Sequence, residues 1–387
     1  MRKYFENLRK KVMICLLCVL YLSACSQPKQ DHSLDSATSY DLDESEYSNF
    51  EQDLESDVVY FLNCEDLPEE ASGWTTPAGD RIMIQSNGHW GMIDVGMAYT
   101  DVMEEQAQDE LEQLIAYNGG HIELDFIIIT HAHIDHYGYF TEMFENHSNL
   151  SMSDEFKVYF KYESDKEKLS IDNTKNEEVY RGILAVLEKR FGENAKKHIL
   201  TSDYPDIVWG DFSISFYNDS LDAINQEKPN NTSTVVYMRH NNGTDILFMG
   251  DVEKDREATL LSGELSNVVD IDILKAGHHG LPSSTGMEFF SHMNPSDVVV
   301  TGLDGMYNPS DDETLAYKCL LNHSNLYGTY FNPDGLRVVF GKNPDEYTFY
   351  GSLTQSLSPQ TVPMKAGTVT LKEYYEFLID DTLKKVG

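Results

Sequence analysis

Residues 129–136 read ITHAHIDH, which places three histidines and one aspartate within six residues. His131, His133 and Asp135 alternate by two positions, and His136 follows directly. Imidazole nitrogens and carboxylate oxygens are the ligands that zinc and similar divalent ions prefer. A single histidine near a strand is most often a satisfied polar residue at the edge of a core. Three histidines and an aspartate at this spacing instead predict a metal site.

Further candidate groups stand where other apolar runs end. Asp94 closes the run MID, Asp251 follows ILFMG, and His278 and His279 follow ILKAG. A lone aspartate at a strand end is usually a turn former or a helix cap. However, open α/β sheets carry their sites at the carboxyl ends of strands. Four apolar runs that each end in such a group therefore predict that the groups meet in one cleft.

The residues between these groups alternate between strand and helix patterns. The turn signal Ser86-Asn87-Gly88 predicts a hairpin, and a strand pair is expected around Asn332-Pro333-Asp334-Gly335. We expect strands at 58–63, 124–130, 212–219, 232–239, 244–251 and 296–302, a hairpin at 81–96, and a strand followed by a loop at 270–280. Helices are expected at 102–120, 177–192, 253–262, 311–324 and 371–386.

This mixture of strands and helices, with hairpins as well as crossovers, predicts one α/β domain of two sheets with helices outside. We expect the domain to span residues 57–350. Residues 351–387 are then a C-terminal extension that includes the last predicted helix. No internal repeat of 20–50 residues is visible in the sequence.

The N-terminal segment has the pattern of a targeting signal. A basic start is followed by an apolar stretch of 11 residues, 12–22, which ends in the sequence Leu22-Ser23-Ala24-Cys25, and this stretch is short for a membrane span. The pattern resembles a bacterial lipoprotein signal, which predicts a signal peptide at residues 1–24 and lipidation of Cys25. The chain would then be anchored to the extracytoplasmic face of the cell membrane. A plain secretory signal or a short membrane anchor is the alternative.

Composition separates a tether from the folded body. Residues 25–56 are acidic, rich in serine and poor in apolar side chains, which predicts a disordered tether. The net charge of the chain is −36, so long-range electrostatics disfavours nucleic acid as a partner. Cys64 and Cys319 remain outside the signal, and they allow either one disulfide or two buried thiols.

The motif THAHIDH matches the T-H-x-H-x-D-H signature of the metallo-β-lactamase superfamily. The order of the other groups agrees, with IDVG before the motif and FMGD and then LKAGHHG after it. The stretches NNTSTVVYMRHNNGTDILFMGDVE and FNPDGLRVVF resemble the competence-type branch, which is similar to the soluble domain of a DNA-uptake channel protein. The resemblance covers about residues 58–342. It implies a four-layer αβ/βα sandwich with the metal ions between the two sheets.

The resemblance also implies a role for each motif residue. His278 is preferred to His279 as a ligand because it follows the glycine of LKAGHHG, which leaves His279 to contact substrate or donate a proton. Asp94 would orient a ligand histidine. Two divalent ions, zinc or possibly manganese, would be bound by His131, His133, Asp135, His136, Asp251 and His278, with Asp251 as the bridge. Such ions lower the pKa of a bound water, and Asp135 would help to orient that water.

Two departures from the family pattern stand out. Family members usually follow the motif with Gly-Gly, whereas this chain has Tyr137-Gly138-Tyr139. Either the backbone is strained there or the tyrosines shape specificity. Many superfamily enzymes also supply a third histidine to the first ion from the middle of the chain. The candidates are His147, His198 and His240, and none of them ends a predicted strand.

The sequence therefore predicts a membrane-tethered, metal-dependent hydrolase. The competence-type resemblance favours a phosphodiester or phosphate ester, either a small molecule or cell-envelope material. Hydrolysis of another ester or amide, such as a β-lactam or a lactone, is one alternative, because a fold does not fix a function. A non-catalytic binding or sensing lipoprotein on the same fold is the other alternative. It is disfavoured because all expected ligand residues are present.

Overall fold

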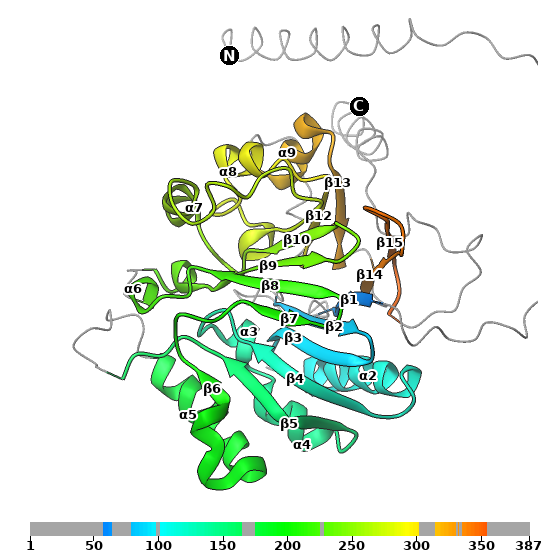
Figure 1. Cartoon of the computed structure of the whole chain (residues 1–387), viewed down its shortest axis with the longest axis vertical. Helices are drawn as coiled ribbons and strands as arrows, with labels where there is room; N and C mark the ends of the chain where they lie inside the picture. The colour runs from blue at the N-terminus through cyan, green and yellow to red at the C-terminus, as the bar shows by residue number, and fades with distance from the viewer. Residues whose placement is uncertain are drawn as a thin grey trace, which may run out of the picture. The chain divides into compact units, whose positions relative to one another are not determined.

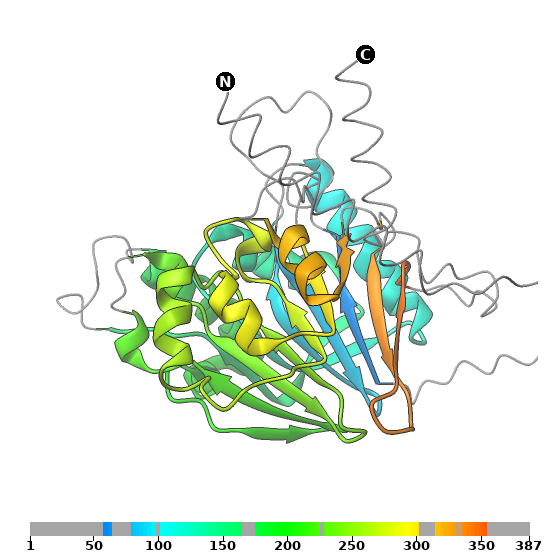
Figure 2. The same cartoon turned by 90° about the horizontal axis from the view of Figure 1, so that it is seen from above.

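The computed structural model describes residues 57–63, 79–97, 101–164, 175–224, 228–301, 314–329, 332 and 335–353. The predicted signal peptide, the tether, Cys25, Cys64 and the helix expected at 371–386 lie outside these residues. Within them, two β-sheets pack face to face and helices cover their outer faces (Figures 1 and 2). None of the helices described is both long and apolar enough to span a membrane.

The first sheet is mixed and has eight strands. Its strands pair in parallel from β3 to β6 and antiparallel elsewhere. In spatial order they are β15 (Tyr347–Tyr350), β14 (Leu336–Phe340), β1 (Asp57–Phe61), β2 (Arg81–Ser86), β3 (His89–Val95), β4 (Ile122–Ile128), β5 (Leu150–Tyr159) and β6 (Ile199–Leu200).

The second sheet has seven strands, which pair in parallel from β10 to β13 and antiparallel from β10 to β7. Its strands are β13 (Asn325–Gly328), β12 (Asp297–Val300), β11 (Ile273–Lys275), β10 (Asp245–Phe248), β9 (Val235–His240), β8 (Phe212–Tyr217) and β7 (Ile207–Trp209).

Helices form the two outer layers. Those against the first sheet are α2 (Asp101–Tyr117), α4 (Phe140–Asn146) and α5 (Lys175–Phe191), and those against the second are α7 (Lys254–Leu261), α8 (Met287–Met293) and α9 (Leu315–Asn322) (Figure 1). The short helices α3 (Ile134–Tyr137) and α6 (Leu221–Ile224), with 3₁₀ turns at Gly192–His198, Pro229–Thr232 and Gly277–Gly280, lie in the connections.

Three separate hydrophobic cores hold the four layers together, and the strand alternation assigns each residue to its core. In β1, Val58 and Tyr60 face the helical layer, whereas Val59 and Phe61 face the other sheet. Successive side chains of a strand point to opposite faces, so a strand covered on both sides must be apolar throughout. The αβ/βα sandwich predicted from the sequence is therefore confirmed, and its central core lies between the sheets.

The predicted hairpin is confirmed by the turn between β2 and β3. Asn87 has φ of 51° and Gly88 has φ of 79°, as a type I′ turn requires at both central residues. The strand pair expected around residues 332–335 is wrong. β13 and β14 do not pair there, since β13 joins the second sheet beside β12 and β14 joins the first sheet between β1 and β15.

Candidate metal centre

The predicted ligands lie at the carboxyl ends of strands from both sheets. The stretch 131–136 follows β4 of the first sheet, Asp251 follows β10 of the second, and His278 and His279 follow β11. β10 and β11 are parallel neighbours, so their carboxyl ends share one edge of the sheet. The two sheets thus present these groups to each other across the sandwich, as the sequence spacing predicted.

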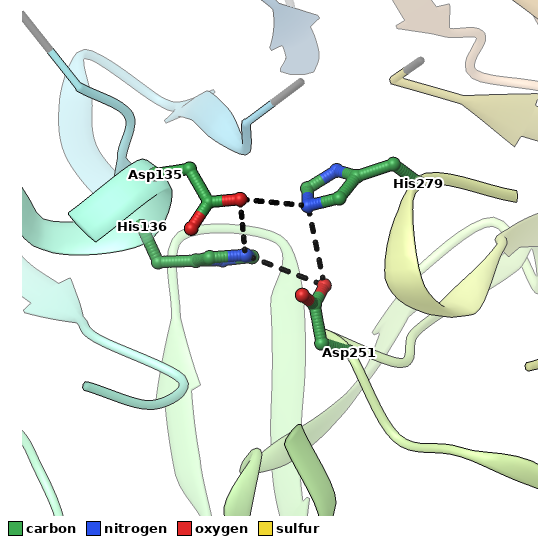
Figure 3. Close-up of side chains that lie close together, drawn as sticks. All are labelled: Asp135, His136, Asp251 and His279. Carbon is green, nitrogen blue, oxygen red and sulfur yellow. Dashed lines mark ion pairs between the residues drawn. The ribbon is translucent and has the colours of Figure 1, made fainter. Parts of the chain in front are cut away.

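Asp135, His136, Asp251 and His279 form one cluster of potential ligands, which Figure 3 shows. Nε2 of His279 lies 3.4 Å from Oδ1 of Asp251 and 3.3 Å from Oδ2 of Asp135. Nε2 of His136 lies 3.3 Å from Oδ1 of Asp251 and 3.8 Å from Oδ2 of Asp135. Ligands at about 2.0–2.1 Å from a tetrahedral zinc ion stand about 3.3 Å from one another. The four atoms therefore have the spacing of a metal-binding set.

The second cluster contains His131, His133 and Asp251. Nε2 of His131 lies 3.7 Å from Oδ2 of Asp251, and the two histidine rings have centroids 4.6 Å apart. Asp251 thus turns Oδ1 toward one cluster and Oδ2 toward the other. Its position between the clusters is that of a bridging carboxylate.

Several buried atoms at this point have no hydrogen-bond partner. They are Nε2 of His131, His136 and His279, together with Oδ1 of Asp251. A buried polar atom is almost always hydrogen-bonded, because leaving it unpaired costs about 1–3 kcal/mol. Here four unpaired atoms converge on the same space. Nitrogen and carboxylate donors at this spacing fit divalent zinc or a similar ion.

The opposite ring nitrogen of two histidines is held by Asp94 and Thr130. Nδ1 of His136 lies 2.7 Å from Oδ2 of Asp94, and Nδ1 of His131 lies 3.2 Å from the Thr130 hydroxyl. Thr130 itself donates to Asp94 from its hydroxyl and from its backbone N–H, both at 2.7 Å. Acceptors on Nδ1 leave the Nε2 lone pair free for a metal ion. The orienting contact expected of Asp94 is present.

His279 has corresponding partners, which sequence reasoning missed. Its Nδ1 lies 3.3 Å from the Thr301 hydroxyl and 3.5 Å from Oδ1 of Asp80. Lys275, fully buried in β11, forms an ion pair with Oδ2 of Asp80. The lysine inside the apolar run DIDILKAG was the available signal, because a buried charge requires a partner.

The carboxylates create a strongly negative field around the cluster. Burial lowers the pKa of His136 and His279, but Asp251 raises both, and the net pKa of each is well above its usual value. Burial raises the pKa of Asp135, but His136 and His279 lower this pKa by more than burial raises it, so its net shift is downward. Positive charge is therefore favoured at this point, whether protons or a metal cation supplies it.

His278, which the sequence favoured as a ligand, lies outside the four-residue cluster. Its Nδ1 lies 2.8 Å from the Ser283 hydroxyl, and its Nε2 lies 3.8 Å from Oδ2 of Asp251. Its side chain is 22% exposed, against 2% for His279. Both residues have left-handed backbones, with φ of 46° and 55°, which is a strained conformation for a residue with a Cβ. This turn directs His279 inward and leaves His278, like Asp135, at the partly exposed side of the site (the opening).

None of the three candidate mid-chain histidines reaches the clusters. Nε2 of His147 lies 3.0 Å from the Tyr139 hydroxyl, and Nδ1 of His198 lies 2.7 Å from the Phe156 carbonyl. Nδ1 of His240 accepts a hydrogen bond from the backbone N–H of Asn242 at 3.2 Å. Within the described residues, the second cluster thus has two histidines and one aspartate.

His240 also lies close to the carboxylates of Asp57 and Asp211. Because Nδ1 accepts a hydrogen bond from the backbone N–H of Asn242, the ring hydrogen of neutral His240 must be on Nε2. That atom lies 3.2 Å from Oδ2 of Asp57. His240 of β9 and Asp57 of β1 therefore form a histidine–aspartate pair, and this arrangement explains the group better than a metal ion does.

The departure at residues 137–139 causes no backbone strain. Tyr139 has φ of −89° and ψ of 1°, and neither tyrosine is among the residues with positive φ, so both have backbones that a residue with a Cβ can adopt. Tyr139 is fully buried and does not line the opening. Tyr137 is partly buried against the core under the first sheet. Of the two tyrosines, only Tyr137 retains a solvent-facing surface.

Comparison with known proteins agrees with this arrangement. Residues 78–170 match the model of the metallo-beta-lactamase superfamily. ComE operon protein 3 of Bacillus subtilis is 28% identical over 209 residues, which cover 52% of this chain and 23% of that protein. The chain thus spans about a quarter of the length of this curated relative.

Solved structures with a similar fold include two that cover much of the chain. The metallo-beta-lactamase fold protein YhfI from Bacillus subtilis has a TM-score of 0.40 at 11% identity, covering 70% of this chain and 96% of its own. The short form of human tRNase Z has a TM-score of 0.39 at 16% identity, covering 63% and 92%. The motif order agrees with the match of residues 78–170 to the metallo-beta-lactamase superfamily model, and the similarity to ComE operon protein 3 agrees with the resemblance to the competence-type branch.

Proposed function

We propose that the chain is a metal-dependent hydrolase of phosphate esters that is tethered to a membrane through Cys25. The observation that carries the hydrolase proposal is the convergence of four buried, unpaired atoms, from His131, His136, His279 and Asp251. Such atoms impose a cost on the fold unless a ligand satisfies them. Two divalent ions bound there would supply a nucleophile from water at neutral pH and would polarise the scissile bond.

The residues of the chain divide the remaining tasks. We assign His279, rather than His278, to the ligand set with Asp135, His136 and Asp251, because its Nε2 has the shorter contacts. His131 and His133 complete the set on the other side of Asp251. Asp135 is the most exposed member of the four-residue cluster, with 25% of its side chain accessible, and this exposure suits it to orient an incoming water.

Polar groups at the opening support an oxyanion substrate. His278 lies beside the Ser283 hydroxyl, and the Asn230 amide lies 3.4 Å from both nitrogens of its ring. These neutral donors would bind the non-bridging oxygens of a phosphate ester after it has entered. Together with the homology to ComE operon protein 3, they support a phosphodiester or phosphate monoester over a β-lactam.

The test is hydrolysis of bis-p-nitrophenyl phosphate by the full-length chain with Zn²⁺ or Mn²⁺. We expect turnover that requires metal and that falls by at least about 100-fold in His133→Ala and in Asp251→Ala. His121→Ala is the matched control, because His121 is exposed and hydrogen-bonds only to Ser151 among the contacts described. Equal activity in all three variants would overturn the proposal.

A chromogenic cephalosporin and a lactone in the same assay separate the alternatives. Turnover of either compound, with no phosphate ester cleaved, would assign the chain to another hydrolase class. Stoichiometric metal binding with no turnover of any compound would favour a binding or sensing module. The lack of a third histidine at the second cluster, within the described residues, is the feature that would weaken catalysis in that case.

The membrane tether is tested separately. A chain with Cys25→Ser should lose incorporation of a labelled fatty acid and should leave the membrane fraction, whereas Cys319→Ser should retain both properties. Cys319 is buried in α9 and is therefore a suitable control. If the Cys25 variant still carries the label, lipidation at this position is excluded.

A further inference from the structure

We propose that Asp80 is a positioning residue for the metal centre, acting on His279 through Thr301 and, through its backbone, on Asp135. This inference rests on the proposed ligand role of His279. Asp80 immediately precedes β2 in the first sheet, whereas His279 and Thr301 follow β11 and β12 in the second. The contacts therefore cross from one half of the sandwich to the other.

The hydrogen bonds of Thr301 fix the direction of the relay. Its hydroxyl donates to Oδ1 of Asp80 at 2.6 Å. A hydroxyl has one proton to give, so its oxygen must accept at the other contact, which is Nδ1 of His279 at 3.3 Å. The proton of His279 is then on Nδ1. Its Nε2 lone pair is left facing Asp251 and Asp135, as a metal ligand requires.

The same arrangement occurs on the other side of the centre. Asp94 accepts from the Thr130 hydroxyl at 2.7 Å, and Thr130 contacts Nδ1 of His131 at 3.2 Å. In each relay the threonine and the histidine thus follow parallel strands of one half of the sandwich, whereas Asp80 reaches its threonine from the other half. This repetition around two different histidines indicates a shared requirement of the site, rather than incidental packing in the core.

Asp80 holds the site from a second direction. Its backbone N–H donates to the carbonyl oxygen of Asp135 at 3.2 Å, so one residue contacts both sides of the four-residue cluster. Lys275 balances the charge of its carboxylate, and both side chains are buried, at 0% and 2% exposure. A buried pair of this kind costs desolvation energy and is weak as a source of stability. A role in fixing the relative position of His279 and Asp135 accounts for its presence.

The test measures the dissociation constant of each metal ion in the full-length chain by competition with a chromophoric chelator. We expect Asp80→Asn and Thr301→Val to weaken one of the two ions by about 10–100-fold and to leave the other unchanged. Thr301→Ser keeps the hydroxyl and should bind both ions as the wild type does. Thr301→Val leaves the buried ion pair of Asp80 and Lys275 intact. This variant therefore tests the relay even if Asp80→Asn does not fold.

Asp297→Asn is the matched control for loss of a buried carboxylate. Asp297 begins β12 and bonds to Asn325 and Tyr347, away from the ligands. Its replacement should lower the melting temperature without changing either dissociation constant. If Asp80→Asn and Thr301→Val bind both ions as tightly as the wild type, or if both ions are weakened equally, the inference about Asp80 is overturned but the proposed function is not. A wild-type chain that binds no metal would overturn the proposed function as well.

Discussion

The side chains of His136 and Asp251 meet across the two sheets, with 3.3 Å between Nε2 and Oδ1. His136 follows β4 of the first sheet and Asp251 follows β10 of the second. A ligand bound between them therefore connects the two halves of the sandwich. This relationship makes metal binding and the stability of the fold interdependent.

Removing divalent ions should lower the melting temperature of the full-length chain. An ion that binds only the native arrangement of His136 and Asp251 adds about 2.7 kcal/mol when its concentration is 100 times its dissociation constant. Thermal unfolding in EDTA and in excess Zn²⁺ measures the difference. In Asp251→Ala the two melting curves should coincide. A wild-type chain that melts at the same temperature in both buffers would contradict this prediction.

His279→Ala should bind fewer ions than the wild type, whereas His278→Ala should keep the full number. The reason is that Nε2 of His279 contacts both Asp135 and Asp251 within 3.4 Å, whereas His278 lies at the opening. Metal analysis of the two purified variants distinguishes the histidines. His278→Ala should instead raise the KM for a phosphate ester. The reverse result would restore His278 as the ligand.

Gly250→Ala should reduce activity by about 100-fold, because small displacements of reacting groups have effects of that size. Gly250 has φ of 51°, and an added Cβ would stand 2.9 Å from Cβ of Ser233. The backbone must shift, and Asp251 is the next residue. Gly263→Ala is the control, since its Cβ would meet only the Thr259 carbonyl at 3.5 Å. Steady-state rates of both variants provide the measurement.

Glu257 should make stability fall as the pH rises from about 4.5 to about 7. Burial raises its pKa to about 7, although the backbone N–H groups of Gly286 and Thr285 lower it. The native state then holds a proton that the carboxyl group releases in the unfolded chain near its usual pKa of 4.5. The linked stabilisation is present below that pH and is lost as the pH passes 7, amounting to about 3 kcal/mol at most.

The measurement for Glu257 is the difference between the pH profiles of the wild type and Glu257→Gln. Urea unfolding at several values between pH 4.5 and 8 yields the free energy of unfolding for each. The variant lacks the titrating group, so its profile should be flatter over this interval, whatever its absolute stability. Parallel profiles would show that Glu257 is ionised throughout in the native state.

The sequence by itself determined most of the strands and the kinds of ligand. Alternation within runs such as VVYF places every second side chain on one face, and burial on both faces requires all of them to be apolar. This information is local, and β1, β4 and β10 were predicted from it. The histidines and aspartates were likewise visible because each stands just after such a run.

Pairings between distant residues could not be read in the same way. β13 and β14 are separated by a short loop, yet they join different sheets. Asp80 is an isolated aspartate in the sequence. Its role becomes visible only through its contact with Lys275, which is 195 residues away. Contacts of this kind depend on how the two sheets pack against each other, for which a single sequence carries no periodic signal.

The choice between His278 and His279 shows the division clearly. Both follow the same strand, both are imidazoles, and their spacing from β11 differs by one residue. Only the left-handed turn and the Thr301–Asp80 contact direct His279 inward and leave His278 at the surface. The local sequence thus determined which chemistry reaches the end of the strand. The tertiary structure decided which atom faces the metal site, because the orientation of the His279 ring is set by partners distant in the sequence, Thr301 on the neighbouring strand and Asp80 from the other sheet.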